Sequence, residues 1–202
     1  MNKNKLLYLD YSFVKKFMKP GDVIAFSGDG FISSLIKWKT KSDISHIGCL
    51  VEHNNNLKLI ESTTLKKKSG VSYCSITDRY NTYNGSLYWF PLERWSYHNL
   101  DVCTYTEFLH DQNGKEYDTI GAILSAIIIY GKEDFSKMFC SELVCAAFKA
   151  GGIAPYINCS EMTPIDVLKL PVFGKYYQFK GEKKTLDLSK GEHGGSNYER
   201  DF

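Results

Sequence analysis

Two strand-like runs joined by a short polar loop place the strongest geometric constraint on this chain. The runs span residues 46–52 and 57–62, and the loop between them reads His-Asn-Asn-Asn, a composition typical of a hairpin turn. A four-residue loop places Gly48 opposite Glu61, and a two-residue turn within the same loop gives the same register. An odd-length loop without a bulge would shift the pairing by one residue and reverse the faces.

In the even register, His46 points to the same face of the hairpin as Glu61 and stands diagonal to it. Diagonal neighbours on adjacent strands are about 7–8 Å apart, which long side chains can span. A histidine and an acid on one face are what a catalytic base and its orienting partner require. The small Gly48 leaves room over that face. The residues alone also allow a structural histidine and a solvated acid.

Cys140 lies where a polar turn becomes an apolar helix, in the run Phe-Cys-Ser-Glu-Leu-Val-Cys. The positive end of the helix macrodipole favours a thiolate at such a position. A distant histidine that meets this thiol in space could take its proton, and His46 is the candidate. A cysteine at the start of an amphipathic helix can equally be a core residue, so the pairing is a hypothesis.

The remaining pattern predicts strands and helices in roughly alternating groups. Turn-rich clusters and apolar spacing mark these elements. We predict further strands at 22–26, 71–76, 85–91 and 176–179, and helices at 11–18, 31–39, 102–110, 119–130 and 140–150, with another helix starting at 163–166.

The chain has 202 residues, which is enough for one domain with a sizeable core. Its net charge of +2 is too small to indicate a dedicated nucleic-acid-binding protein. The six cysteines show no CxxC spacing, which favours free thiols in a reducing compartment. We therefore predict a domain over residues 1–180 and, because residues 181–202 are rich in Lys, Glu, Gly and Ser, a disordered tail.

Two apolar stretches are too short for membrane or export signals. The N-terminal residues before Asp10 are too few for a signal-peptide core, and residues 120–130 fall well short of the roughly 20 needed to cross a bilayer. A soluble cytoplasmic protein without a transmembrane segment is the expectation. The sequence does not indicate an oligomeric state.

Six short motifs, taken in order, resemble the circularly permuted branch of the NlpC-type papain-like cysteine hydrolases, in particular the YiiX/YebB-like group. Lecithin:retinol acyltransferase-like enzymes are more distant relatives. In this branch the histidine strand comes first and the cysteine helix last, the reverse of ordinary papain-like chains. The motifs are Pro20-Gly21-Asp22-Val23-Ile24-Ala25-Phe26, Ser45-His46-Ile47-Gly48, Leu59-Ile60-Glu61-Ser62, Gly114-Lys115-Glu116-Tyr117-Asp118, Phe139-Cys140-Ser141-Glu142-Leu143-Val144 and Thr163-Pro164-Ile165-Asp166.

The resemblance implies an α+β, permuted papain-like fold, with a small antiparallel sheet packed against helices. It implies Cys140 as nucleophile, His46 as base and later acid, and Glu61 as the residue that orients the imidazole. Tyr117 matches a Tyr-Asp pair of the family and could help to bind an oxyanion or substrate, or could be a core tyrosine. Asp22 belongs to a Gly-Asp turn and is treated as structural.

The implied chemistry is acyl transfer through an acyl-enzyme, without a metal or organic cofactor. An amide bond in a peptide, isopeptide or peptidoglycan fragment is the first choice of substrate, and a lipid ester is the alternative. A catalytically silent binding module on the same fold stays open. A zinc site is disfavoured, since His46 and Cys49 on one strand point to opposite faces.

Overall fold

The computed structural model describes residues 7–28, 37, 42–65, 68–115, 140–159 and 162–189. Several predicted features lie outside these residues: the helix at 119–130, Tyr117, the last part of the tail at 190–202 and, apart from Lys37, the helix at 31–39.

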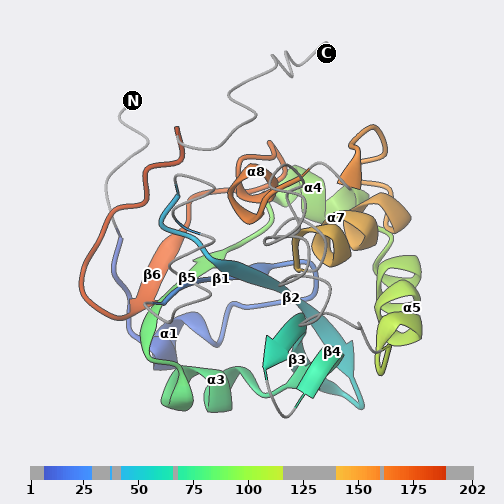
Figure 1. The fold of residues 1–202 in the computed structure, drawn as a ribbon. Helices are drawn as coiled ribbons and strands as arrows, with labels where there is room; N and C mark the ends of the chain where they lie inside the picture. Colours follow the sequence, from blue (N-terminus) through green and yellow to red (C-terminus); the bar gives the residue numbers. More distant parts are fainter. Residues whose placement is uncertain are drawn as a thin grey trace, which may run out of the picture.

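A six-stranded antiparallel sheet runs through the molecule in the order β4-β3-β2-β1-β5-β6, with helices on both sides (Figure 1). This arrangement confirms the predicted α+β class. The strands are β1 (Val23–Gly28), β2 (His46–His53), β3 (Asn56–Leu65), β4 (Lys68–Cys74), β5 (Gly85–Phe90) and β6 (Tyr177–Lys180).

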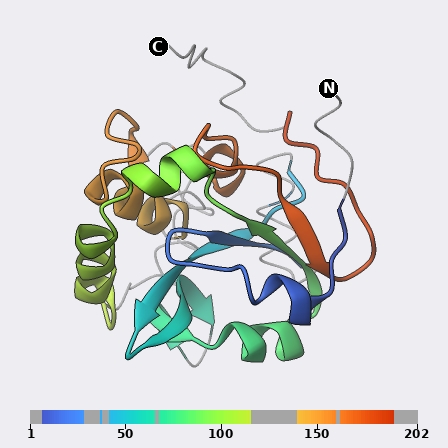
Figure 2. The same cartoon turned by 180° about the vertical axis from the view of Figure 1, so that it is seen from behind.

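Alternate residues of each strand enter two separate apolar clusters, one on each face of the sheet. On β1, Val23 and Ala25 join the first cluster, whereas Ile24 and Phe26 join the second. Helices α5, α7 and α8 contribute to the first cluster, and α1 and α3 to the second, where they lie close together along one edge (Figure 2). The helices are α1 (Tyr11–Val14), α3 (Ile76–Thr82), α4 (Arg94–Asn99), α5 (Val102–Gln112), α7 (Cys140–Ala150) and α8 (Pro164–Leu168).

The β2–β3 hairpin has the predicted register. Asn54 and Asn55 form a two-residue turn with positive φ angles of 51° and 58°, a conformation that asparagine tolerates better than most residues. Cys49 then pairs with Ile60. The side-chain faces of both strands therefore follow from the loop length alone.

The helices near the C-terminus begin and end close to where their capping residues predict. Helix α7 spans the predicted range, and Gly152 follows it with a φ of 81° that suits glycine. Helix α8 begins with a capping box between Thr163 and Asp166. Helices α3 and α4 were not predicted. Within the described residues, no helix combines the length and apolarity needed to cross a bilayer.

The segment that follows β6 packs on the domain. Leu186 is buried in the first apolar cluster, and the Tyr88 hydroxyl donates to the carbonyl oxygen of Lys184 at 3.2 Å. The Lys184 ammonium also pairs with Asp43 at 2.8 Å. Residues 181–189 thus differ from the disordered tail predicted from residue 181, because Leu186 in this polar run lies in the core and Leu188 packs against it.

Asp22 joins the turn before β1 to the segment that follows β5. One carboxylate oxygen accepts the Leu92 backbone N–H at 2.9 Å, and the other accepts the Trp89 indole N–H at 2.9 Å and the Lys19 backbone N–H at 3.1 Å. Burial raises the pKa of Asp22 to about 6 in spite of these donors. Its role is structural, as the Gly-Asp turn suggested.

We expect Asp22→Ala to lower the free energy of unfolding by on the order of 3 kcal/mol, because it leaves several buried N–H donors without an acceptor. Asp101→Ala is the matched control, since Asp101 is an exposed cap of α5 that accepts the Thr104 N–H, and loss of a cap costs about 1 kcal/mol. Urea unfolding measures both values. Equal losses in the two variants would contradict the structural role of Asp22.

Candidate active site

The structure brings His46 and Glu61 into direct contact. His46 is the first residue of β2, and its Nε2–H donates to the Oε2 atom of Glu61 at 2.9 Å. The His46 ring also packs against Phe26, its neighbour on β1, with ring centroids 5.0 Å apart. The diagonal placement expected from the hairpin register is therefore present, and the two side chains close the gap between the strands.

This contact depends on the absence of a side chain at position 48. A Cβ atom at Gly48 would lie 2.9 Å from Leu59 Cδ1, 3.0 Å from the Ile60 carbonyl oxygen and 3.1 Å from Glu61 Cβ. Because one of these atoms belongs to the backbone, the strand could not relieve the clash by rotating a side chain. Glycine at this position lets β3 carry Glu61 close to β2.

The ladder between β2 and β3 stops near the site. Their pairing reaches Cys49 and Ile60, whereas β3 continues to Leu65 in register with β4. Helix α7 contacts both β2 and β3. The start of β2 thus lies beyond the paired residues of β3, and this is where the first residue of α7 approaches His46.

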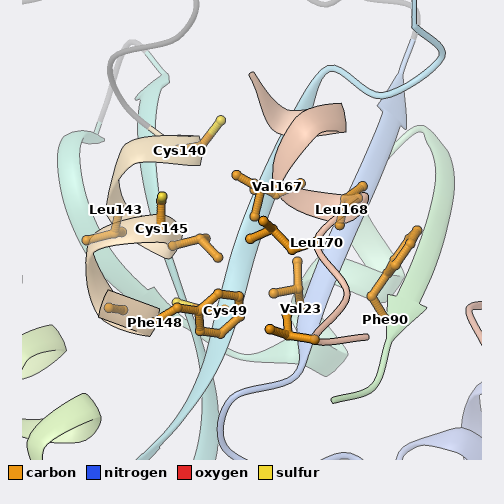
Figure 3. Close-up of a cluster of buried hydrophobic side chains, with 14 of the residues drawn as sticks. Val23, Cys49, Phe90, Cys140, Leu143, Cys145, Phe148, Val167, Leu168 and Leu170 are labelled. Atoms are coloured by element: carbon orange, nitrogen blue, oxygen red, sulfur yellow. The ribbon is translucent and has the colours of Figure 1, made fainter. Parts of the chain in front are cut away.

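Cys140 begins α7 and is 6% exposed. Figure 3 shows its sulfur pointing away from the apolar side chains that surround Cys145 and Phe148. The thiol interacts with the His46 ring and with the backbone N–H groups of Ile47 and Ser141. Cys140 thus belongs to the core by its backbone position, but its sulfur faces the histidine.

The charges of Cys140 and His46 stabilise one another. Burial acts to raise the pKa of the Cys140 thiol, but attraction and hydrogen bonding from His46 outweigh it, so that this pKa is lowered. Burial likewise acts to lower the pKa of His46, but Cys140 and Glu61 together raise it to about 10. Each group thus favours the charged form of the other, the thiolate of Cys140 and the imidazolium of His46.

Glu61 is 1% exposed and is held between two cations. Its Oε1 atom accepts the Arg79 Nε–H at 2.7 Å and a second N–H from the same guanidinium, while Oε2 accepts from His46. Cys74 Sγ lies 3.4 Å from Oε1 as a weak donor. Burial acts to raise the pKa of Glu61, but His46 and Arg79 lower it to about 2.

Arg79 is a site residue that the sequence reasoning missed. It comes from α3, which begins after Ser75, whose hydroxyl accepts the Asp78 N–H. A serine followed three residues later by an acid is a recognisable start of a helix, so α3 could have been predicted. Nothing in the spacing of Arg79 and Glu61 indicates that they meet. Tyr117, the fourth predicted site residue, lies outside the described residues.

The comparisons with known proteins find a likeness in fold. No protein-family model and no curated protein matches the chain. Among solved structures, the chain is similar to the metalloprotein YiiX from Escherichia coli O157:H7, at a TM-score of 0.54 and 18% sequence identity. The match covers 82% of this chain and 98% of YiiX. At this identity the likeness shows a shared fold and leaves the activity to be argued from the site.

YiiX is named a metalloprotein, which raises the question whether the side chains around His46 could hold a metal ion. Among the residues that the structure describes, no three His, Cys, Asp or Glu side chains are grouped as metal ligands. Both oxygens of Glu61 are already bound, by His46 and by the cationic Arg79. Cys49 packs in the first apolar cluster, on the face opposite to Phe26 and His46. This donor set does not fit a metal ion.

We expect the stability contribution of Glu61 to depend on pH with a definite sign. Its pKa is about 2 in the folded state against an ordinary 4.5, so the stabilisation is complete above pH 4.5 and is lost as the pH falls toward 2. Glu61→Gln should therefore lower the free energy of unfolding by about 3 kcal/mol at pH 5.5 but by only about 1 kcal/mol at pH 3.

Chemical unfolding at the two pH values tests this expectation. Glu52→Gln is the matched control, because Glu52 lies on the same hairpin with an exposed side chain, and it should change little at either pH. A Glu61→Gln effect that does not vary with pH would mean that Glu61 is not held ionised by His46 and Arg79.

Proposed function

We propose that this chain is a cysteine hydrolase or acyltransferase with a circularly permuted papain-like fold. One observation carries the proposal: Nε2 of His46 binds Glu61 while the same ring interacts with the Cys140 thiol. Because Nε2 is occupied, we assign Nδ1 as the ring nitrogen that serves the thiol. A nucleophile, a base and an orienting acid are thereby connected in series. The shared fold with YiiX supports the YiiX-like part of the resemblance.

In the first half of the reaction, the Cys140 thiolate attacks a carbonyl carbon of the substrate. The carbonyl π electrons move to oxygen, and the backbone N–H of Cys140 at the start of α7 helps to hold this oxyanion. The tetrahedral intermediate then collapses, and His46 gives its Nδ1 proton to the leaving amine or alcohol. The product is a thioester on Cys140 together with neutral His46.

In the second half, neutral His46 takes a proton from water or from an acceptor alcohol or amine as that nucleophile attacks the thioester. Collapse of the second intermediate releases the acyl product and restores the thiolate and imidazolium. Glu61 keeps Nε2–H bound throughout, so that Nδ1 remains the nitrogen that exchanges protons. Water gives hydrolysis, and another acceptor gives transfer.

An amide bond in a peptide, isopeptide or peptidoglycan fragment is our first choice of substrate. The departure of an amine requires a proton, and the His46 imidazolium, which lies beside the Cys140 thiol, can supply it. A lipid ester or thioester is the alternative on the same machinery. A binding module without turnover is the second class, and the reactivity of Cys140 separates it from both.

We expect Cys140 to be alkylated by iodoacetamide far faster than the exposed Cys103 below pH 8, because only Cys140 has a thiolate paired with a histidine. Mass spectrometry from pH 5 to 9 gives the rate for each cysteine. In His46→Ala the advantage of Cys140 should disappear. If both cysteines react alike in the wild-type protein, there is no activated pair and the binding module is favoured.

Turnover variants test the roles one by one, with peptide amides, thioesters and phospholipid esters as the substrate panel. Cys140→Ser should abolish turnover with the fold intact, and His46→Ala should lower it by about 10³-fold or more. Glu61→Gln should lower it by a smaller factor, on the order of 10-fold to 100-fold, since the acid orients the base and takes no part in bond exchange. Cys103→Ser is the control, and full activity in Cys140→Ser would end this mechanism.

A further inference from the structure

The guanidinium of Arg79 binds the carboxylate of Glu61 on the side away from His46. Its Nε–H and a second N–H both point to Oε1, while Oε2 receives the proton of His46. We propose that Arg79 is a positioning residue that fixes Glu61 for His46 and so sets the charge balance of the whole site. This inference rests on the proposed function and extends the triad by one member.

The geometry gives Arg79 control over the orientation of the acid. A carboxylate at the end of a glutamate side chain can turn about its last bond, whose rotational preference is broad. Two N–H donors in a planar fork hold one oxygen in place, which commits the other oxygen to His46. Cys74 also touches Oε1, but a thiol is a weak donor and cannot replace a guanidinium.

The charge count points the same way. When Cys140 is ionised, it and Glu61 bring two negative charges to the site, and His46 and Arg79 bring two positive ones. Removing Arg79 leaves a net negative charge beside a buried thiol, which disfavours the thiolate. Arg79 therefore acts on Cys140 through Glu61 and His46 and needs no contact with substrate.

A pocket beside the ion pair makes Arg79 accessible to a chemical substitute. The pocket has a volume of about 510 Å³, and both Glu61 and Arg79 line it, together with hydroxyl side chains such as Ser72 and Thr82. Arg79 is 22% exposed. The charged and titratable groups that face Glu61 or share the pocket are His46 on β2, Lys58 on β3, Tyr73 and Cys74 on β4, and Asp78 and Arg79 on α3.

The test is chemical rescue of Arg79→Ala by methylguanidinium, a small cation with the same planar fork. The first readout is the pH profile of Cys140 alkylation. The second is the proton resonance of the His46 Nε2–H, which is visible only while a carboxylate holds that proton. Arg79→Lys tests whether charge without the fork suffices, and Arg94→Ala removes an exposed arginine of α4 as the matched control.

In Arg79→Ala we expect the midpoint of the alkylation profile to move up by about one pH unit and the Nε2–H resonance to be lost. Methylguanidinium should restore both, Arg79→Lys should restore part of the shift, and Arg94→Ala should behave like the wild-type protein. A wild-type profile and resonance in Arg79→Ala would overturn the proposal. A loss that neither lysine nor methylguanidinium reverses would overturn it as well, since it reports a damaged fold.

The two readouts separate this proposal from the function on which it rests. If wild-type Cys140 reacts no faster than Cys103, the acyl-transfer function fails. The Nε2–H resonance of His46 does not depend on a reactive thiol, so it still decides whether Arg79 positions Glu61. An activated Cys140 together with a resonance that survives in Arg79→Ala would keep the function and reject the role of Arg79.

Discussion

A buried carboxylate that needs two cations is the interaction on which this structure depends. An ionised glutamate at 1% exposure would be strongly unfavourable by itself, so Glu61 is tolerated only because His46 and Arg79 reach it from either side. His46 comes from β2 and Arg79 from α3, whereas Glu61 lies on β3. The carboxylate therefore links these three elements. The same ion pairs that make Glu61 tolerable also fix the imidazole, so that the stability of this region and the geometry of the site have one origin.

The meeting of Cys140 with His46 is less obvious, because the helix and the histidine belong to opposite faces of the sheet. Leu143 and Val144 of α7 pack in the first cluster, whereas His46 contacts Phe26 of the second. The contact is possible because it occurs at the first residue of β2, outside the part of the strand that pairs with β3.

Local chemistry made the hairpin and α7 predictable from the sequence. The Asn-rich loop sets the register that aligns His46 with Glu61, and apolar spacing with a following glycine defines the helix of Cys140. Arg79 could not be found in this way. Its partner Glu61 lies on a strand 18 positions earlier. No helix or strand repeat predicts a contact between residues at that separation. The segment around Leu186 escaped prediction for a similar reason, because two leucines, Leu186 and Leu188, in a polar run are too few to define a periodic pattern.

The pairing of the first described residues with β6 has a consequence for the order in which the protein can fold. The Leu9 backbone N–H donates to the Gln178 carbonyl oxygen at 2.9 Å. The Gln178 backbone N–H donates to the Leu7 carbonyl oxygen at 3.0 Å. During synthesis the segment around Leu7 and Leu9 must wait for its partner until β6 has left the ribosome. Such long-range closure is slow. Cys140 is also made long after His46, so a nascent chain carries the histidine hairpin well before the helix that brings Cys140 to it.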